Sequence, residues 1–165
     1  MAHDKPEISI LLIAAAKYTN ETDAKITIEW LKENDADNIL SINLFLDEEI
    51  NKERYEAATA LVDKMEKLYG SDEQILIKRI GLAAKEEKQD LVVKLVEQAY
   101  QKYPETYVFV DLKVDVEKAI NKSPAKALSV LKKFLKTNYN YEAQKSLSDL
   151  YMGYGQVGPG LEAFN

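Results

Sequence analysis

The chain has 165 residues, of which 46% are hydrophobic and 30% charged, and its formal net charge is −6. This length suits one domain that buries a sizeable core. All 22 basic residues except Arg54 and Arg79 are lysines. Because an acidic chain poor in arginine holds phosphate backbones badly, we expect no nucleic-acid partner.

The chain contains no cysteine, which excludes disulfides and cysteine metal sites. Its longest apolar run, Ile8 to Ala16, is too short to cross a bilayer, so we expect no membrane insertion. This run also resembles the core of a signal peptide, but the segment before it lacks a net positive charge. We therefore expect a cytoplasmic protein. A secreted or periplasmic mature chain without its signal peptide is the alternative.

In chain order, apolar residues recur with the spacing of helices that bury one face. The glycine after the fourth predicted helix, Gly70, suits a helix end. Ser71 and Gln74 resemble a capping box that opens the next helix. The predicted helices span approximately 8–18, 23–34, 39–50, 52–69, 71–85, 90–103, 106–120, 123–137 and 141–154.

Residues 106–120 fit two periods. A strand is predicted by alternating apolar residues: Val108, Val110, Leu112, Val114 and Val116. A helix is predicted by a second stripe: Phe109, Leu112, Val116 and Ala119. We favour the helix, because both flanks are helical and a lone strand has no partner strand in this chain.

A repeat emerges from the predicted second helices. Small or β-branched residues recur at intervals of 34, 34 and 35 residues: Ala24, Ala58, Val92 and Ala127. A larger apolar residue follows each one four positions later, and a third apolar residue follows three positions after that. Such a period indicates stacked helical hairpins, because one hairpin cannot bury its apolar face alone.

This pattern resembles the tetratricopeptide repeat (TPR). Val96, Ala99 and Pro104 match second-helix positions of that family, and Leu147, Tyr151 and Gly155 match first-helix positions of an incomplete fifth unit. Sel1-like and other α-solenoid repeats are alternatives. The resemblance implies an all-α, right-handed α-solenoid of about 4.5 repeats in one domain, 1–165. Its units are approximately 5–36, 37–70, 71–104, 105–139 and 140–165, the last one incomplete.

The C-terminal end carries Gly158, Pro159 and Gly160, so we expect no packing helix after Gly155. The final helix then caps the stack, or the chain is a fragment of a longer protein. The glycines at 153, 155 and 158 match a dinucleotide-binding pattern. We interpret them as a glycine-rich end, because a helix rather than a strand precedes them.

The resemblance implies a non-catalytic scaffold that holds a protein or peptide partner on the concave face made by the first helices. Its alternative is a structural helical segment that packs against other domains of a larger protein. Self-association through the terminal helix is a further expectation. Polar positions on the predicted first helices give the candidate partner-binding residues: Asn43, Asp47, Lys78, Asp111, Lys113 and Gln144.

We predict no catalytic residue, cofactor site or metal site. The only histidine, His3, lies near the N-terminus, and most carboxylates are interpreted as solvated. Asp111 and Asp115 are the exception, because they lie one turn apart and suit a hard cation or a lysine. The tyrosines from Tyr139 to Tyr154 fit either packing or an aromatic recognition surface.

Overall fold

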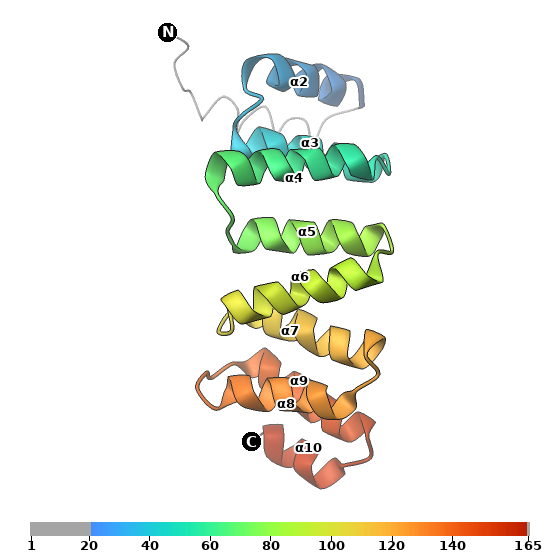
Figure 1. Ribbon diagram of the computed structural model, residues 1–165, viewed down its shortest axis with the longest axis vertical. Helices are drawn as coiled ribbons and strands as arrows, with labels where there is room; N and C mark the ends of the chain where they lie inside the picture. Colours follow the sequence, from blue (N-terminus) through green and yellow to red (C-terminus); the bar gives the residue numbers. More distant parts are fainter. Residues whose placement is uncertain (1–20, 165) are drawn as a thin grey trace. The chain divides into compact units, whose positions relative to one another are not determined.

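The computed structural model describes residues 21–164, except the side chains of residues 21, 23, 24, 157, 161 and 164. The predicted helix at 8–18 lies outside this range. The described part is helical and contains no strand (Figure 1). Its elements are α2 (Glu21–Asn34), α3 (Ile39–Asn51), α4 (Tyr55–Tyr69), α5 (Glu73–Lys85), α6 (Gln89–Lys102), α7 (Tyr107–Asp115), the π-helix η1 (Val116–Ile120), α8 (Pro124–Leu135), α9 (Tyr141–Gly153) and α10 (Val157–Phe164).

The ambiguous segment is helical, so the helix prediction is confirmed and the strand alternative is wrong. α7 buries Phe109, Val110 and Val114, which lie on one side of a helix but on both faces of a strand. Contacts with neighbouring helices therefore decide the conformation, and the alternation of valines does not. No helix of the described part is both long and apolar enough to cross a membrane.

The expectation of no packing helix after Gly155 is wrong, because α10 packs on α9. The Ser148 hydroxyl donates a hydrogen bond of 2.7 Å to the Gly160 carbonyl oxygen. A Cβ at Gly160 would lie 2.7 Å from Met152 Cγ. Glycine therefore serves close helix approach here, rather than the loop that it suggests in the sequence.

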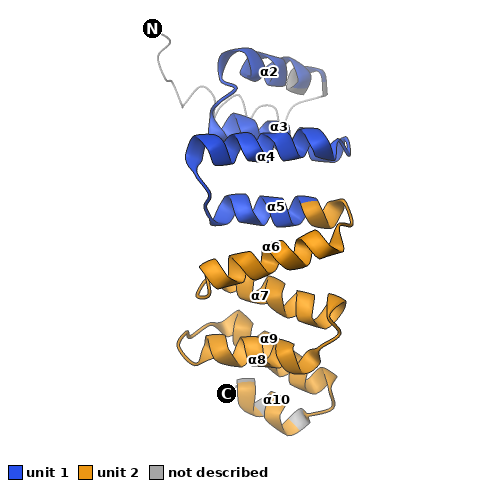
Figure 2. Ribbon diagram, viewed as in Figure 1, with its two compact units in different colours: residues 1–82 blue, residues 83–165 orange. Residues whose placement is uncertain are grey.

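The chain forms two compact units, residues 1–82 and 83–165, and the boundary falls inside α5 (Figure 2). Two α-helices fall in each of the predicted ranges 37–70, 71–104, 105–139 and 140–165, and the range 105–139 also contains η1. The single continuous domain and its repeat boundaries remain a prediction.

Unit 1 is held by apolar contacts between α3, α4 and α5. The predicted line of α4, Ala58, Val62 and Met65, is fully buried. It packs with residues of α3 and α5: Ile42, Leu46, Ile75 and Leu82. Complete burial of one such aliphatic side chain stabilises the fold by about 1.5–3 kcal/mol.

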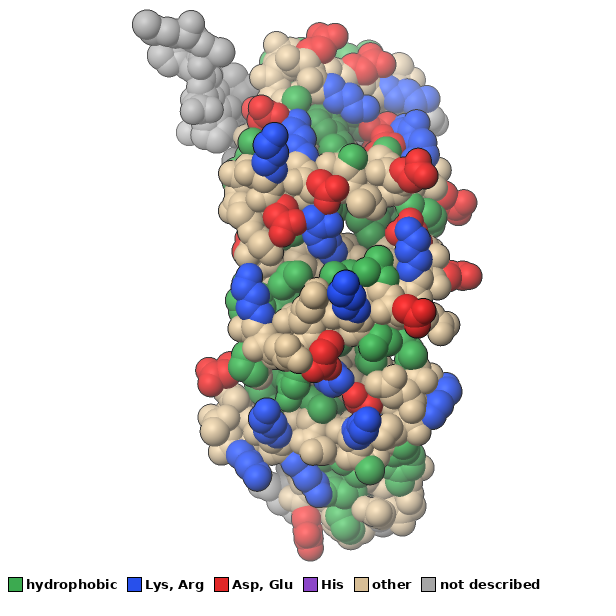
Figure 3. Space-filling model, in the orientation of Figure 1, with side chains coloured by type: hydrophobic (Ala, Val, Ile, Leu, Met, Phe, Trp, Pro, Cys, Tyr) green, Lys and Arg blue, Asp and Glu red, His purple; other side chains and the backbone are tan. Residues whose placement is uncertain are grey.

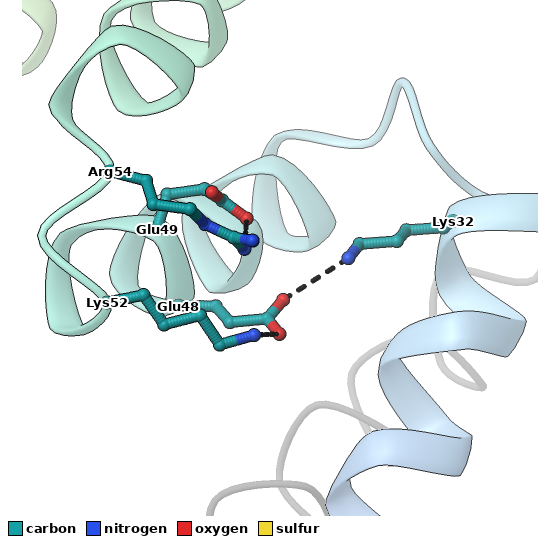
Figure 4. A network of polar contacts seen from close by, with 5 residues as sticks. All are labelled: Lys32, Glu48, Glu49, Lys52 and Arg54. Atoms are coloured by element: carbon teal, nitrogen blue, oxygen red, sulfur yellow. Dashed lines mark hydrogen bonds and ion pairs between the residues drawn. The ribbon is translucent and has the colours of Figure 1, made fainter.

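Ion pairs add to this packing in unit 1. The Arg79 guanidinium of α5 donates to Asp63 at 2.7 Å and also to Glu66, both on α4. Lys32 of α2 reaches Glu48 of α3 at 3.3 Å (Figure 4). These pairs join neighbouring helices, although exposed pairs contribute about 0–1 kcal/mol each.

Unit 2 has its own core between α7, α8 and α9. Val110 and Val114 of α7 meet Ala127, Leu131 and Phe134 of α8, together with α9 residues Ala143, Leu147, Leu150 and Tyr151. Rings add contacts: Tyr103 stacks on Phe109 with centroids 5.6 Å apart, and Tyr107 lies 5.8 Å from Phe134. The small Ala127 and the larger residues after it fill the positions predicted from the repeat.

The backbone conformation of the turns also repeats along the chain. A residue with positive φ follows the first helix of four hairpins: Glu53 (57°), Glu87 (57°), Lys122 (51°) and Gly155 (73°). These residues are 34, 35 and 33 positions apart. In three of the turns the next N–H bonds to a carbonyl oxygen five residues back: Arg54 to Glu49, Lys88 to Ala83 and Gln156 to Tyr151. This is the hydrogen bond of a Schellman helix end.

The hairpin of α7 and α8 carries one additional residue. Its Ser123 N–H bonds to the Glu117 carbonyl oxygen, six residues back, and the Asn121 N–H bonds to Val116, five back. The second bond defines the wider π-helical turn. The π-helix η1 thus absorbs the extra residue of the 35-residue interval.

The helix expected to open at Ser71 starts slightly later. α5 begins at Glu73, and the Asp72 carboxylate accepts a hydrogen bond of 2.9 Å from the Ile75 N–H. Asp72 therefore supplies the side-chain cap, one residue after the serine of the predicted capping box.

Candidate functional site

A pocket of about 340 Å³ opens between α7 and α9 in unit 2. We call it the α7–α9 pocket. Its polar lining comes from Asp111, Lys118, Ser146, Asp149 and Tyr154, and its other lining residues are Val114, Leu150 and Gly153. The volume lies at the lower end of the range for ligand-binding pockets, about 300–1,000 Å³.

The helical core places these polar groups. Val110, Leu147 and Leu150 are buried in the unit 2 cluster. The residue that follows Val110 is Asp111, and Ser146 and Asp149 precede the two leucines. Neighbours of buried positions lie at the edge of the buried stripe of a helix, so these side chains reach the pocket while the helices pack.

Tyr107 connects the two helices at the pocket. Its hydroxyl lies 3.1 Å from Ser146 Oγ on α9 and 3.5 Å from Asp111 Oδ1 on its own helix. The second distance is long for an O–H···O hydrogen bond, so Asp111 receives weak compensation from it. Burial raises the pKa of the Tyr107 hydroxyl, and the nearby charge of Asp111 raises it further.

The Asp111 carboxylate is only half-buried, yet its ionised form is destabilised. Burial raises its pKa, and the negative charge of Asp115 one turn away adds to the rise. The Tyr107 hydrogen bond and the charge of Lys118 act in the opposite direction without cancelling it. Asp111 forms no ion pair with a described residue, whereas Asp115 lies 3.5 Å from Lys118 Nζ.

The arrangement suits a cationic side chain. Asp111 and the exposed Asp149 offer carboxylate oxygens, which accept hydrogen bonds from an ammonium or guanidinium group. Val114 and Leu150 give an apolar wall for the aliphatic stem of lysine or arginine. Within the described residues, no three Asp, Glu, His or Cys side chains are grouped as a metal ion requires.

The other candidates in unit 2 lie elsewhere. Lys113 Nζ pairs with Glu97 at 2.6 Å and Glu117 at 2.7 Å, and its side chain is 14% exposed. It therefore presents little surface to a partner. Gln144 is half-buried on α9 and does not line the α7–α9 pocket.

The candidates in unit 1 are not gathered in one pocket. Asn43 donates to the Ile39 carbonyl oxygen at 2.8 Å, and its own Oδ1 is buried without a hydrogen-bond partner. Asp47 is exposed on α3, and Lys78 is half-buried on α5. A separate groove of about 560 Å³ between α2, α3 and α4 includes none of the three.

Sequence reasoning missed Ser146, Asp149 and Tyr154 as pocket residues. Ser146 and Asp149 are three positions apart on α9, and each precedes a buried leucine. This spacing places both polar side chains on the same side of the helix, which could have been recognised in the sequence. The pairing of α7 with α9 was needed to place them opposite Asp111. Tyr154 is 45% exposed, which agrees better with the recognition interpretation of the last tyrosines, while Tyr151 is buried in the core.

Solved structures resemble this fold over almost the whole chain. MamA 41-end from Desulfovibrio magneticus RS-1 matches with a TM-score of 0.63 and 12% identity, over 99% of this chain and 93% of that one. MamA AMB-1 matches with a TM-score of 0.56 and 13% identity, over 97% and 90%. YrrB, described as a TPR protein with an unusual peptide-binding site, matches with a TM-score of 0.52 and 13% identity, over 97% and 84%.

These matches show that the chain has a TPR-like, all-α helical-repeat fold, as the repeat predicted. At identities this low, the matches show the fold and no function. No protein-family model matches the sequence, and no curated protein matches it either.

Proposed function

We propose that the chain is a non-catalytic protein-interaction module, and that the α7–α9 pocket receives a lysine or arginine side chain from a partner segment. The observation that carries this proposal is the Asp111 carboxylate, which lines a pocket, has a raised pKa and lacks an ion pair with a described residue. An incoming cation supplies the charge that this carboxylate needs.

The geometry supports one binding mode. The charged end of the ligand contacts Asp111 and Asp149, and its aliphatic stem lies against Val114 and Leu150. Tyr154 offers a ring at the same pocket, and an aromatic face attracts a cation. The Tyr107 to Ser146 hydrogen bond links the helices before the ligand arrives, which lowers the entropy cost of binding.

The fold adds support by analogy. The description of YrrB names a peptide-binding site in a chain with a similar fold. For the present chain, peptide binding rests on the pocket, because a shared fold does not fix a function.

Other predicted features stay predictions. They are a role in partner binding for Asn43, Asp47, Lys78, Lys113 and Gln144, self-association through the last helix, and a cytoplasmic location. The contacts of α10 with α9 do not test self-association.

Selection from a library of displayed random peptides tests the proposal. The full chain serves as bait beside two variants: Asp111→Asn with Asp149→Asn, and, as a matched control, Glu29→Gln with Glu33→Gln on α2. Both pairs remove two exposed or half-buried carboxylates. We expect wild type and control to enrich peptides that share one lysine or arginine, and the pocket variant to lose them. Peptides that bind all three proteins equally, or that share no cation, would contradict the proposal.

A further inference from the structure

α8 presents a face of lysines without acidic residues. Its sequence from Pro124 to Leu135 contains no Asp or Glu. Lys132, Lys133 and Lys136 surround a shallow hollow of about 670 Å³ that also includes Ala125, Leu128 and Ser129. We call this surface the α8 lysine patch. Figure 3 shows basic side chains gathered over the part of unit 2 that α8 occupies in Figure 1.

Among the described residues, the lysines of this patch have no carboxylate partner. Lys132, Lys133 and Lys136 form no ion pair with a described residue. Two of them are placed by rings: Lys132 Nζ lies 5.1 Å from the Tyr151 centroid, and Lys133 Nζ lies 6.0 Å from that of Tyr100. A ring orients an ammonium group but does not neutralise it, so the charge stays free to bind an anion.

The patch also has room for a partner. Ala125 and Ser129 are exposed and lie one helical turn apart, in line with Lys132 and Lys136. Their small side chains leave the hollow open between the lysines. A partner backbone or helix therefore reaches the surface of α8 without displacing a large side chain.

We propose that the α8 lysine patch docks an acidic segment of a partner protein. Charge complementarity supports this choice, because three lysines without an ion pair to a described residue lie together on a chain whose net charge is −6. The patch is separate from the α7–α9 pocket, and the proposal does not depend on ligand binding there.

The chemistry of the patch fits a membrane or a nucleic acid less well. Basic helices that bind membranes also insert apolar side chains, but no large apolar side chain described on α8 is exposed. Nucleic-acid surfaces favour the arginine fork, which this face lacks, and the negative charge of the whole chain repels phosphates.

Fluorescence anisotropy with a labelled oligoglutamate peptide tests the proposal on the full chain. The test variant is Lys132→Gln, Lys133→Gln and Lys136→Gln. The matched control is Lys67→Gln, Lys85→Gln and Lys94→Gln, which removes three exposed lysines elsewhere. We expect wild type and control to bind alike, and the test variant to bind about three- to tenfold more weakly, since exposed ion pairs contribute little each. Asp111→Asn should bind at least as well as wild type.

Amide chemical shifts of the wild-type chain provide a readout that survives misfolding of a variant. Oligoglutamate should shift the signals of Ala125, Ser129 and Lys132. No binding, equal loss in both triple variants, or shifts confined to other helices would overturn the proposal. Vesicles containing phosphatidylserine form the second arm. Vesicle binding tighter than peptide binding, and lost in the test variant, would assign the patch to membranes instead.

Discussion

Lys113 Nζ lies 2.7 Å from Glu117 Oε1, and the two side chains are only 14% and 4% exposed. The pair spans the junction between α7 and the π-helix η1. Glu97 of α6 reaches the same ammonium group at 2.6 Å. This partly buried triad joins α6 to α7 and η1 inside unit 2.

Removal of the central cation should destabilise unit 2. Lys113→Met leaves Glu117 buried without its partner, which costs about 3–5 kcal/mol for a buried pair. The double variant Lys113→Met with Glu117→Met should recover most of this loss, because no isolated buried charge remains. Urea unfolding of the full chain measures both. A double variant no more stable than the single one would show that packing, rather than charge, explains the loss.

The same triad should make the fold sensitive to acid. Burial raises the pKa of Glu117, but the hydrogen bonds from Lys113 and Asn121 outweigh it, so the pKa lies below the usual value. The Lys113 hydrogen bond likewise lowers the pKa of Glu97. A folded-state pKa below the unfolded value, about 4.3 for Glu, stabilises the fold above that pH. This stabilisation is lost as pH falls through the folded-state pKa.

Circular dichroism during acid titration measures this effect. We expect the slope of stability against pH in the acid range to be shallower in the Lys113→Met, Glu117→Met double variant than in wild type. The effect should appear in the acid range, because the pKa values of both Glu97 and Glu117 are lowered in the folded chain. Identical acid slopes in the two proteins would contradict a role for the triad.

Asp111 should show the opposite behaviour. Its folded-state pKa is raised by burial and by Asp115, so its ionised form is less favourable in the folded chain than in the unfolded chain. Its destabilising effect grows as pH rises through that pKa. Asp111→Asn should therefore raise the melting temperature slightly at neutral pH and leave it unchanged in strong acid. A lower melting temperature of Asp111→Asn would contradict this and assign Asp111 a structural role. Glu29→Gln serves as the control, with no expected change.

Left-handed turn residues offer a test of the repeat. Glu87 and Lys122 have positive φ, which costs a residue with a Cβ about 1–2 kcal/mol. Glycine removes this cost but loses more conformational entropy on folding, which offsets part of the gain. Glu87→Gly and Lys122→Gly should therefore each stabilise the chain by about 0.5–1 kcal/mol. Gly155→Ala at the corresponding turn should destabilise it by about 1 kcal/mol. Thermal unfolding measures all three.

A glycine inside a helix provides the control for that series. Lys94→Gly in α6 should cost about 1 kcal/mol, because no left-handed conformation is relieved there. If Glu87→Gly and Lys122→Gly were as damaging as Lys94→Gly, the strain assigned to these turns would be absent.

The contact between α9 and α10 should depend on two small residues. Ser148→Ala removes the hydrogen bond to Gly160 and should cost about 1 kcal/mol. Gly160→Ala places a methyl group against Met152 and 3.3 Å from the Ser148 carbonyl oxygen. Hydrogen exchange should show faster exchange in α10 for both variants, with α3 and α4 unchanged. Unchanged protection of α10 would show that this contact is not what holds the helix.

The repeat was predictable because small and large apolar residues recur in the sequence at a fixed interval. Ala58 and Ala127 are fully buried where the 34-residue pattern placed them. The π-helix was not predictable, since one extra residue in an interval fits a loop as well as a helix. α10 was missed because Pro159 and Gly160 suggest a loop, although proline suits a first helical turn and glycine allows close packing.

The site was predictable only in part. Asp111, one of the candidates chosen as polar positions on first helices, lines the α7–α9 pocket, and its role in partner binding stays a prediction. Lys113 was predicted for the same face, but residues two apart on a helix point about 200° away from each other. Its side chain turns instead to Glu97 and Glu117. Partners from other helices, such as Ser146, required the folded structure.

A titration of the isotope-labelled full chain with a short arginine peptide tests the central claim most directly. The control peptide carries citrulline, which has nearly the same shape without the charge. We predict saturable shifts at Asp111, Ser146 and Gly153 with the arginine peptide, much weaker shifts with the citrulline peptide, and none in Asp111→Asn. Equal binding of the two peptides, or saturable shifts only outside the α7–α9 pocket, would contradict it.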